Sequence, residues 1–276
     1  RVIAETNNMH RTYVFDVKDT LLEGENYLAV RFSSPIRYLD AHPSKMGRKF
    51  SVIRKAACMF GWDWGLSLPD MGIWRDIGLE AFDGARLSRV VVRQKHVKQN
   101  VDLEIDVHTD VWNKDVETRV ELLSPEGETI DCQTRIARRV ASFCMRVEHP
   151  RLWWPVGCGD QPLYSLRISL RQGKRLLDER EQKVGLRTIV LNRDKKPDGS
   201  NYGFIVNGTP VFFRGENLVI EDAILSRTSN ARWDRLLDNC VRSNLNGIRV
   251  WGGAYYPPDY FYEQCDRLGF LVWQDL

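Results

Sequence analysis

The sequence has little excess charge, no long apolar run and no paired cysteine motif. Its 276 residues carry 40 basic and 37 acidic side chains, which gives a formal net charge of +3 at pH 7. This near balance provides no electrostatic reason to expect nucleic acid or a membrane surface as a partner. No apolar run reaches the roughly 18 residues that a membrane-spanning helix needs. The composition, 43% hydrophobic and 11% aromatic, instead favours well-packed globular structure of about two or three domains.

Cysteine spacing argues against a metal site. None of the six cysteines forms the C-x-x-C pattern of a zinc ligand set, so we expect free, partly buried thiols. Asn207-Gly208-Thr209 matches a glycosylation sequon, but a β-turn explains it equally well, and the compartment stays open. The cysteines are Cys58, Cys132, Cys144, Cys158, Cys240 and Cys265.

Two β-rich units are predicted for the first two thirds of the chain. Residues 11–17, 26–34 and 73–82 have strand composition and are separated by polar turns. From about residue 86 to 185, alternating segments recur every ten to fifteen residues with turn signals such as Ser124-Pro125-Glu126-Gly127 between them. This spacing is typical of a β-sandwich of about 100 residues.

The pattern changes after the second unit. An apolar strand at 211–213 is followed by a helical pattern that starts near Ser229 or Asn230, and then by the buried strand "GIRVWGG". A helix opened by proline and closed by glycine, "PPDYFYEQCDRLG", leads to a third buried strand, "FLVWQDL". This order predicts the beginning of a parallel α/β domain. A barrel of eight β/α units takes about 250 residues, so we expect the chain to be a piece of a longer protein.

Polar side chains lie at the ends of these three strands. Because active sites of parallel barrels form at the carboxyl ends of the strands, Glu216, Asn217, Arg249, Trp251 and Asp275 are candidates for one rim. An arginine, an amide and an indole ring suit a sugar. The alternative is structural: Trp251 in the core and Arg249 paired with Asp275. Glu216 alone does not make a glycosidase, which needs two carboxylates about 5–5.5 Å apart in the retaining case.

The segment "FGWDWG" at residues 60–65 places Asp63 between Trp62 and Trp64. A buried carboxylate costs several kcal/mol unless its oxygens receive hydrogen bonds. Either the protein supplies those donors, with Arg54 as the nearest candidate, or a ligand does.

Three long segments carry a resemblance to a known family. Residues 53–82, 152–164 and 249–275 resemble the β-mannosidases of the glycoside hydrolase 2 group, in the same order as in that family. The resemblance implies a jelly-roll sugar-binding domain at 1–85 without its first strands, and an immunoglobulin-like sandwich at 86–186. The start of a (β/α)₈ barrel at 187–276, truncated after its third strand, would follow.

The same resemblance implies the chemistry and the site. The family removes terminal non-reducing β-D-mannose by a retaining, two-glutamate double displacement, and both glutamates would lie beyond this chain, which we therefore expect to be inactive by itself. Asp63 would accept hydrogen bonds from sugar hydroxyls, while Trp62 and Trp64 wall the pocket. Asn217 and Trp251 would touch the sugar, with Arg249 behind them. No metal or organic cofactor is implied.

Several points depart from the family or stay open. Leu218, Ala254 and Pro257 replace the residues usual at those positions near the pocket rim, which leaves the exact sugar uncertain. A β-galactosidase, β-glucuronidase or exo-glucosaminidase relative is one alternative, and a non-catalytic carbohydrate-binding protein is another. The expected partners are β-linked mannosides, with a homodimer as an option and neither nucleic acid nor a membrane. A secreted, periplasmic or lysosomal-type compartment is favoured over the cytoplasm.

Overall fold

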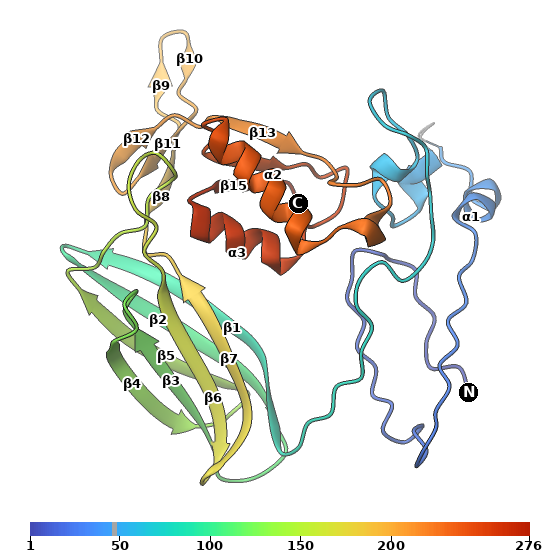
Figure 1. Ribbon diagram of the computed structural model, residues 1–276, viewed down its shortest axis with the longest axis horizontal. Coiled ribbons are helices and arrows are strands. Elements are labelled where there is room, and N and C mark those ends of the chain that lie inside the picture. The colour runs from blue at the N-terminus through green and yellow to red at the C-terminus, as the bar shows by residue number, and fades with distance from the viewer. Residues whose placement is uncertain (46–48) are drawn as a thin grey trace.

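The computed structural model describes residues 1–45 and 49–276. Three regions follow one another along the chain (Figure 1). We call residues 1–84 the N-terminal arm, residues 85–184 the sandwich, and residues 212–276 the βα unit. A group of short strands at 189–211 connects the last two.

The N-terminal arm is mostly extended and carries little regular structure. The strands predicted at 11–17, 26–34 and 73–82 are wrong for this chain, because the described part of the arm shows two isolated bridges, Asn8 with Arg54 and Phe60 with Ser67, and no strand. Its helical elements are α1 (Pro35–Ala41) and the 3₁₀ turns η1 (Lys49–Val52) and η2 (Ala57–Met59).

The physical reason is the lack of pairing partners. A strand is stabilised by hydrogen bonds to a neighbouring strand and by burial of one face, and the arm supplies neither. Tyr27 is 88% exposed and Leu28 is 64% exposed. The short helix α1 was missed, although Ser34 accepts a hydrogen bond from the Arg37 amide and Pro35 follows it, which is a familiar helix start.

The predicted sandwich is confirmed as two antiparallel sheets. One sheet has the order β1-β2-β5 and the other β4-β3-β6-β7, an arrangement of seven strands typical of immunoglobulin-like domains. The strands are β1 (Ala85–Val97), β2 (Asn100–Val111), β3 (Val116–Leu123), β4 (Thr129–Ile136), β5 (Val140–Glu148), β6 (Tyr164–Gln172) and β7 (Arg175–Val184).

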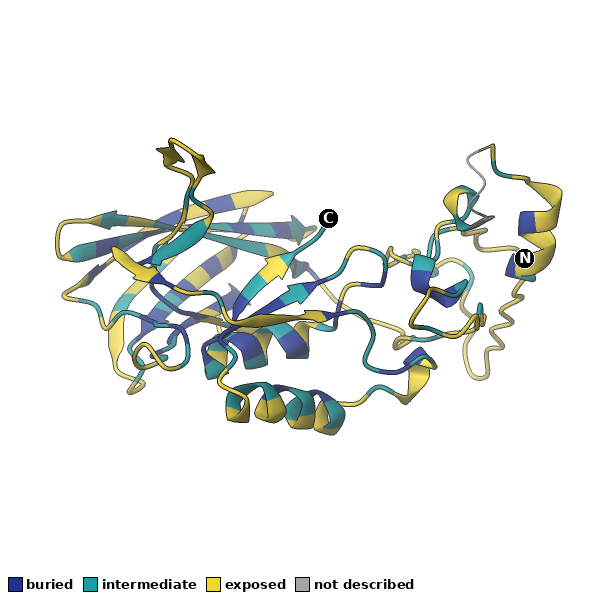
Figure 2. Ribbon diagram, turned by 90° about the horizontal axis from the view of Figure 1, so that it is seen from above, coloured by how far each residue is buried: buried dark blue, intermediate teal, exposed yellow. Residues whose placement is uncertain are grey.

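Alternation along the strands builds the core between the sheets. In β5 every second residue is buried, and Phe143 and Met145 point inward between exposed neighbours. They meet Leu166 and Ile168 of β6, both fully buried. Figure 2 shows the same alternation of buried and exposed positions along the sandwich strands.

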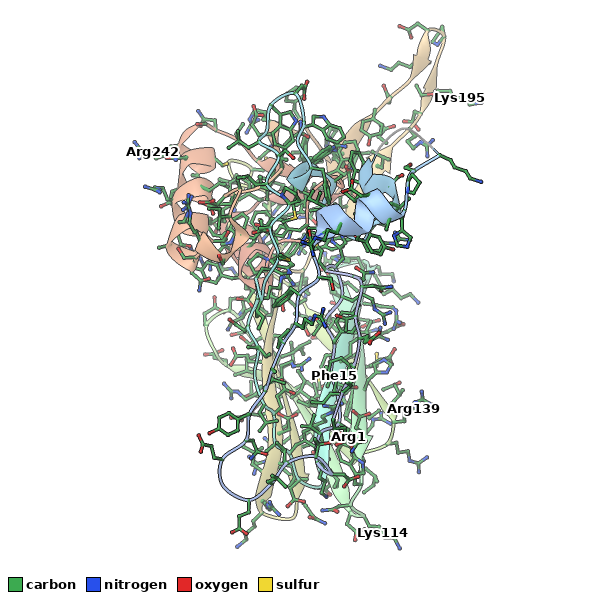
Figure 3. The ribbon with its side chains drawn as sticks, turned by 90° about the vertical axis from the view of Figure 1, so that its right-hand side faces the viewer. Arg1, Phe15, Lys114, Arg139, Lys195 and Arg242 are labelled. Atoms are coloured by element: carbon green, nitrogen blue, oxygen red, sulfur yellow. The ribbon has the colours of Figure 1, made fainter. Side chains whose placement is uncertain are left out.

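The connecting strands include the predicted Asn-Gly hairpin. Strands β11 (Gly203–Val206) and β12 (Thr209–Val211) pair across a two-residue turn in which Asn207 and Gly208 both have positive φ. Strand β8 (Ile189–Asn192) pairs with β11. The small hairpin β9 (Lys195–Lys196) and β10 (Gly199–Ser200) projects from this end of the molecule, and Lys195, where the hairpin begins, is labelled in Figure 3.

The βα unit is a parallel three-stranded sheet with two helices. Its order β13-β14-β15, with one helix after each of the first two strands, confirms the predicted strand–helix alternation. The elements are β13 (Gly215–Leu218), η3 (Leu225–Arg227), α2 (Asn230–Arg242), β14 (Gly247–Val250), α3 (Asp259–Leu268) and β15 (Leu271–Gln274).

One boundary in this unit differs from the sequence prediction. The segment 211–213 was expected to be the first parallel strand, but β12 ends at Val211 and β13 begins only at Gly215. The Phe213 ring lies over the sheet, where a Cβ on Gly215 or Gly247 would come within 2.3 Å or 2.1 Å of it. The two glycines therefore let the aromatic ring cover the backbone, and the parallel strand starts after it.

Both helices cover the same face of the parallel sheet (Figures 1 and 2). Trp233 and Leu237 of α2 and Phe261 of α3 are buried against this face. Gly269 ends α3 in the left-handed conformation at φ 87°, as the sequence predicted. In the part of the chain that the structure describes, the opposite face of the sheet carries no helix (Figure 2).

The sandwich and the βα unit meet at a buried tryptophan. Trp153 is fully buried among Val206, Val211 and Leu271, and its Nε1 donates to the Asp266 carbonyl at 2.6 Å. Trp153 therefore lies at the junction between the sandwich and the βα unit. Local periodicity in the sequence gives no signal of such a long-range contact.

Two further predictions concern the whole chain. All six cysteines are free, and Cys58 and Cys265 are buried, as expected. No helix in the described residues is long and apolar enough to cross a membrane.

Candidate functional site

The register of the parallel sheet aligns three of its polar and aromatic side chains. Asn217 of β13 pairs with Arg249 of β14, which pairs with Trp273 of β15. Because residues opposite one another in a parallel sheet point to the same side, the three lie in one row, on the face that the helices leave uncovered. The sequence placed Asn217 and Arg249 at strand ends. The structure places them inside the strands, one residue before the end in each case.

Arg249 is the centre of a hydrogen-bonded cluster in this row. Its Nε and Nη2 donate to the two carboxylate oxygens of Asp275 at 3.2 Å and 2.6 Å. Its Nη1 donates to Oδ1 of Asn217 at 3.0 Å. Fork-shaped contacts of this kind fix the plane of a guanidinium. Arg249 is therefore paired with Asp275, as the structural alternative in the sequence analysis expected. The same arginine also donates to Asn217.

Trp251 leaves the end of β14 and stands at the edge of the cluster. Its ring folds back over Gly253, where a Cβ would come within 2.2 Å of the indole. The rings of Trp62 and Trp64 meet it edge-on, with centroids 5.1 Å and 5.8 Å away and interplanar angles of 81° and 77°. Edge-to-face pairs at this spacing are favourable for aromatic rings.

The "FGWDWG" segment therefore forms a tight turn against the βα unit. The Trp62 and Gly65 backbones exchange hydrogen bonds of 3.3–3.4 Å, and Gly61 has φ 90°, which favours glycine. One turn earlier in the chain, the Cys58 amide donates to the Gly253 carbonyl at 2.9 Å. These contacts join two segments almost 200 positions apart.

Asp63 lies at the tip of this turn and is exposed. The expectation that a buried carboxylate needs an internal donor does not apply here, because water reaches the side chain. Within residues 1–45 and 49–276 no ion pair joins Asp63 to Arg54. The carboxylate is thus presented at the tip of a turn whose two tryptophans contact Trp251.

Glu216 lies on the other side of the sheet from the Arg249 cluster. It pairs in register with Ile248, which packs against the helices, and its charge helps to raise the pKa of Cys240 in α2, after the effect of burial. The expectation that Glu216 shares one rim with Asn217 and Arg249 is therefore wrong, because successive residues of a strand point to opposite faces of the sheet.

Sequence reasoning missed three contributors to the site. Trp273 shares the row of Arg249, and the alternation in "VWQD" would have placed it there. Gly253 and the Cys58 backbone fix Trp251 and the turn, but only the "GG" after Trp251 hinted at a close approach.

The residues that precede the turn, Ala56, Cys58 and Met59, are buried and apolar, and Lys55 lies next to them. Burial raises the pKa of the Cys58 thiol to about 11. Burial also lowers the pKa of Lys55, an effect that the Asp70 charge partly offsets. Among the described side chains, no group of three or more His, Cys, Asp or Glu residues comes together as a metal-binding cluster.

Comparison with known proteins places this geometry in a family. Residues 1–75 match the family model described as glycosyl hydrolase 2 galactose-binding domain-like, and residues 85–187 match the model described as glycosyl hydrolases family 2. The chain belongs to glycosyl hydrolase family 2. Within this family, β-mannosidase of Bos taurus is 30% identical over 309 residues, covering 99% of this chain and 34% of the relative.

Solved structures give the same result at the level of the fold. The crystal structure of β-D-mannosidase from Dictyoglomus thermophilum matches with a TM-score of 0.91 and 34% identity, over 99% of this chain and 35% of that chain. Parabacteroides merdae β-glucuronidase matches with a TM-score of 0.60 over 69% of this chain, but at 15% identity it is similar in fold alone. This family 2 chain spans about a third of the length of the curated relatives it matches.

Proposed function

We propose that this family 2 chain supplies part of the sugar pocket of a retaining exo-β-mannosidase. The observation that carries the proposal is the contact of the "FGWDWG" turn with Trp251, beside the Asn217 and Arg249 cluster. It joins an exposed carboxylate, indole rings and an amide at one edge of a parallel sheet. The similarity to β-mannosidases over 99% of the chain supports mannose as the sugar.

Each side chain has a role in this proposal that its chemistry suits. Asp63 accepts hydrogen bonds from hydroxyls of the terminal mannose, and Asn217 donates one or more. The rings of Trp62, Trp64 and Trp251 pack against the apolar faces of the sugar. Charge-assisted hydrogen bonds such as those to Asp63 contribute on the order of 1.5–3 kcal/mol each when water is excluded.

The reaction itself needs groups outside these residues. In the proposed double displacement, one glutamate attacks the anomeric carbon, and a second protonates the leaving oxygen and later activates water. Both glutamates would belong to later strands of a (β/α)₈ barrel that begins with β13, β14 and β15. The 276 residues alone would then bind sugar weakly and turn nothing over.

The domain division belongs to the same proposal. A sugar-binding domain at 1–85, an immunoglobulin-like sandwich at 86–186 and the opening of the barrel at 187–276 would each contribute to the full-length enzyme. A homodimer and a secreted, periplasmic or lysosomal-type compartment complete the proposal.

The test is kcat/KM of the full-length gene product on a panel of aryl β-glycosides, measured alongside the Asp63→Ala variant. We expect fastest cleavage of the mannoside, and a fall of at least about 100-fold in the variant, which corresponds to about 2.7 kcal/mol of transition-state binding. Arg54→Ala is the matched control: it removes the charged side chain that the sequence offered as a partner of Asp63 but that makes no ion pair with it among the described residues, and it is expected to leave kcat/KM within about threefold.

Three outcomes would contradict the proposal in different ways. Preference for a galactoside, glucuronide or glucosaminide would replace the sugar and retain the reaction. Binding of manno-oligosaccharides without cleavage would point to a carbohydrate-binding protein. An Asp63→Ala variant as active as the parent would make "FGWDWG" a packing element and nothing more.

A further inference from the structure

Asp275 holds the centre of the cluster from the end of β15. Its Oδ1 accepts from Nε of Arg249 at 3.2 Å, and its Oδ2 accepts from Nη2 of Arg249 at 2.6 Å and from the Gly252 amide at 3.1 Å. The backbone of Asp275 is held as well, because its amide donates to the Val250 carbonyl at 3.1 Å. Three hydrogen bonds to two carboxylate oxygens leave its side chain little freedom.

The contact with Arg249 determines where the rest of the guanidinium points. A guanidinium is planar and only donates hydrogen bonds. With Nε and Nη2 bound to Asp275, the remaining nitrogen, Nη1, is directed at Asn217 and reaches its Oδ1 at 3.0 Å. Since Arg249 cannot accept, the amide of Asn217 must turn its oxygen toward the arginine.

The orientation of the Asn217 amide follows from this. With Oδ1 facing Arg249, the NH₂ group of Asn217 points away from the cluster, and within the described residues no partner for Nδ2 is found. Asn217 is exposed on the uncovered face of the sheet. The cluster thus presents a hydrogen-bond donor to whatever occupies the edge of the sheet.

We propose that Asp275 is a positioning residue for the sugar: acting through Arg249, it orients the Asn217 amide so that Nδ2 donates to an oxygen of the bound glycoside. The inference rests on the proposed function, and it adds the residue that sets the direction of the donor. Loss of the carboxylate frees Arg249 to rotate and leaves the Asn217 amide able to flip, which would turn an acceptor toward the sugar.

A double-mutant cycle in the full-length gene product tests the route. We expect Asp275→Ala and Asn217→Ala each to lower kcat/KM on the best aryl glycoside by about tenfold, the loss of one hydrogen bond between the neutral Asn217 amide and the sugar. If Asp275 acts through Asn217, the double variant is as active as Asn217→Ala alone, within about threefold. If instead the two losses in kcat/KM multiply in the double variant, the two residues act independently and the proposal is overturned. A merely structural effect of Asp275→Ala would behave in this way.

The matched control is Asp102→Ala in the sandwich. Asp102 accepts a similar fork from Arg146, Nε to Oδ1 at 2.7 Å and Nη2 to Oδ2 at 2.9 Å, far from the site in the fold. We expect this variant to lower the melting temperature and to leave kcat/KM unchanged. A fall in kcat/KM with Asp102→Ala as large as that with Asp275→Ala would make the effect one of stability and would also overturn the proposal.

Failure of the proposed function remains distinguishable from failure of this inference. If the enzyme prefers another glycoside, the sugar assignment fails and the cycle is measured on that substrate. If it cleaves none, the proposed reaction fails and the crystal structure of the Asp275→Ala protein decides. In that structure we expect the Arg249–Asn217 hydrogen bond to be broken, and its retention would overturn the role of Asp275.

Discussion

The sandwich and the N-terminal arm are both β-rich in sequence, yet only the sandwich forms sheets. Every strand of the sandwich finds its partners within residues 85–184, and its core is closed by fully buried side chains such as Ile105 and Leu166. The arm carries large apolar residues of the same kind, and Tyr27 and Leu28 are largely exposed. Strand composition is therefore not sufficient for a sheet. The sheet forms only where a partner strand is available.

Part of the arm is nevertheless buried against the βα unit. Cys58 and Met59 are buried with Ala254 and Tyr255, and the "FGWDWG" turn follows directly. This part of the arm packs on a surface almost 200 residues away in the sequence. The match to a longer β-mannosidase structure over 99% of the chain fits this picture, since the arm follows the same course there.

The largest expected effect is on the unfolding free energy, and it compares one leucine of the sandwich with one leucine of the arm. Leu166→Ala in the sandwich leaves a cavity in a fully buried site and should cost about 2–5 kcal/mol of unfolding free energy. Leu28→Ala in the arm, 64% exposed, should stay within about 0.5 kcal/mol. Urea unfolding of the 276-residue chain followed by circular dichroism measures both. Equal costs would show that the arm is buried in solution.

The second prediction breaks the contact between the arm and the βα unit. Gly253→Val places a side chain where the Trp251 ring lies, 2.2 Å from a Cβ, and the ring must leave Trp62 and Trp64. We expect a cost of about 1–3 kcal/mol, loss of near-ultraviolet dichroism from the tryptophans, and faster chymotrypsin cleavage at the turn.

The control for that prediction lies in the turn itself. Gly65→Ala meets no atom within 4 Å and needs no positive φ, so it should leave the spectrum and the cleavage rate unchanged. An unchanged spectrum in Gly253→Val would show that Trp251 does not depend on this glycine for its position.

The smallest expected effect concerns the junction of the sandwich with the βα unit. Arg187 lies over the Trp153 ring, with its guanidinium carbon 4.4 Å from the ring centroid, and pairs with Asp266 at 3.2 Å. Burial raises the pKa of Asp266, and Arg187 partly offsets this. A carboxyl whose pKa is raised by folding contributes less to stability as the pH rises through its titration range.

Arg187→Met removes the compensating charge and retains the packing. The pKa of Asp266 then rises further, so the variant should lose stability at pH 7 and lose less at pH 4. Because the Asp266 side chain is 38% exposed and solvent screens its charge, we expect the loss at pH 7 to be at most about 1 kcal/mol. The melting temperature across this range measures the difference. Adding Asp266→Asn should abolish the pH dependence of the loss, and a loss independent of pH in the single variant would contradict the role of the pair.

Much of the local structure was accessible from the sequence. Alternation predicted the sandwich strands, the Asn207-Gly208 pair predicted a β-turn, where the structure has positive φ at both residues, and Gly269 predicted the end of α3. Each of these depends on a few neighbouring residues, whose backbone preferences and periodicity act over a short range. The candidate rim at Asn217, Arg249, Trp251 and Asp275 also followed from strand order, because parallel strands end at the same edge.

The contacts that build the site were decided by tertiary structure. The sequence by itself determined that a carboxylate stands between two tryptophans, and that an arginine and a tryptophan lie two residues apart near the end of a strand. Only the folded chain brought Trp62 and Trp64 to Trp251, exposed Asp63 at the tip of the turn, and directed Arg249 at both Asp275 and Asn217. The reason is physical: side chains up to 200 positions apart meet through packing and hydrogen bonds that depend on the whole fold, while local propensities carry no information about distant partners.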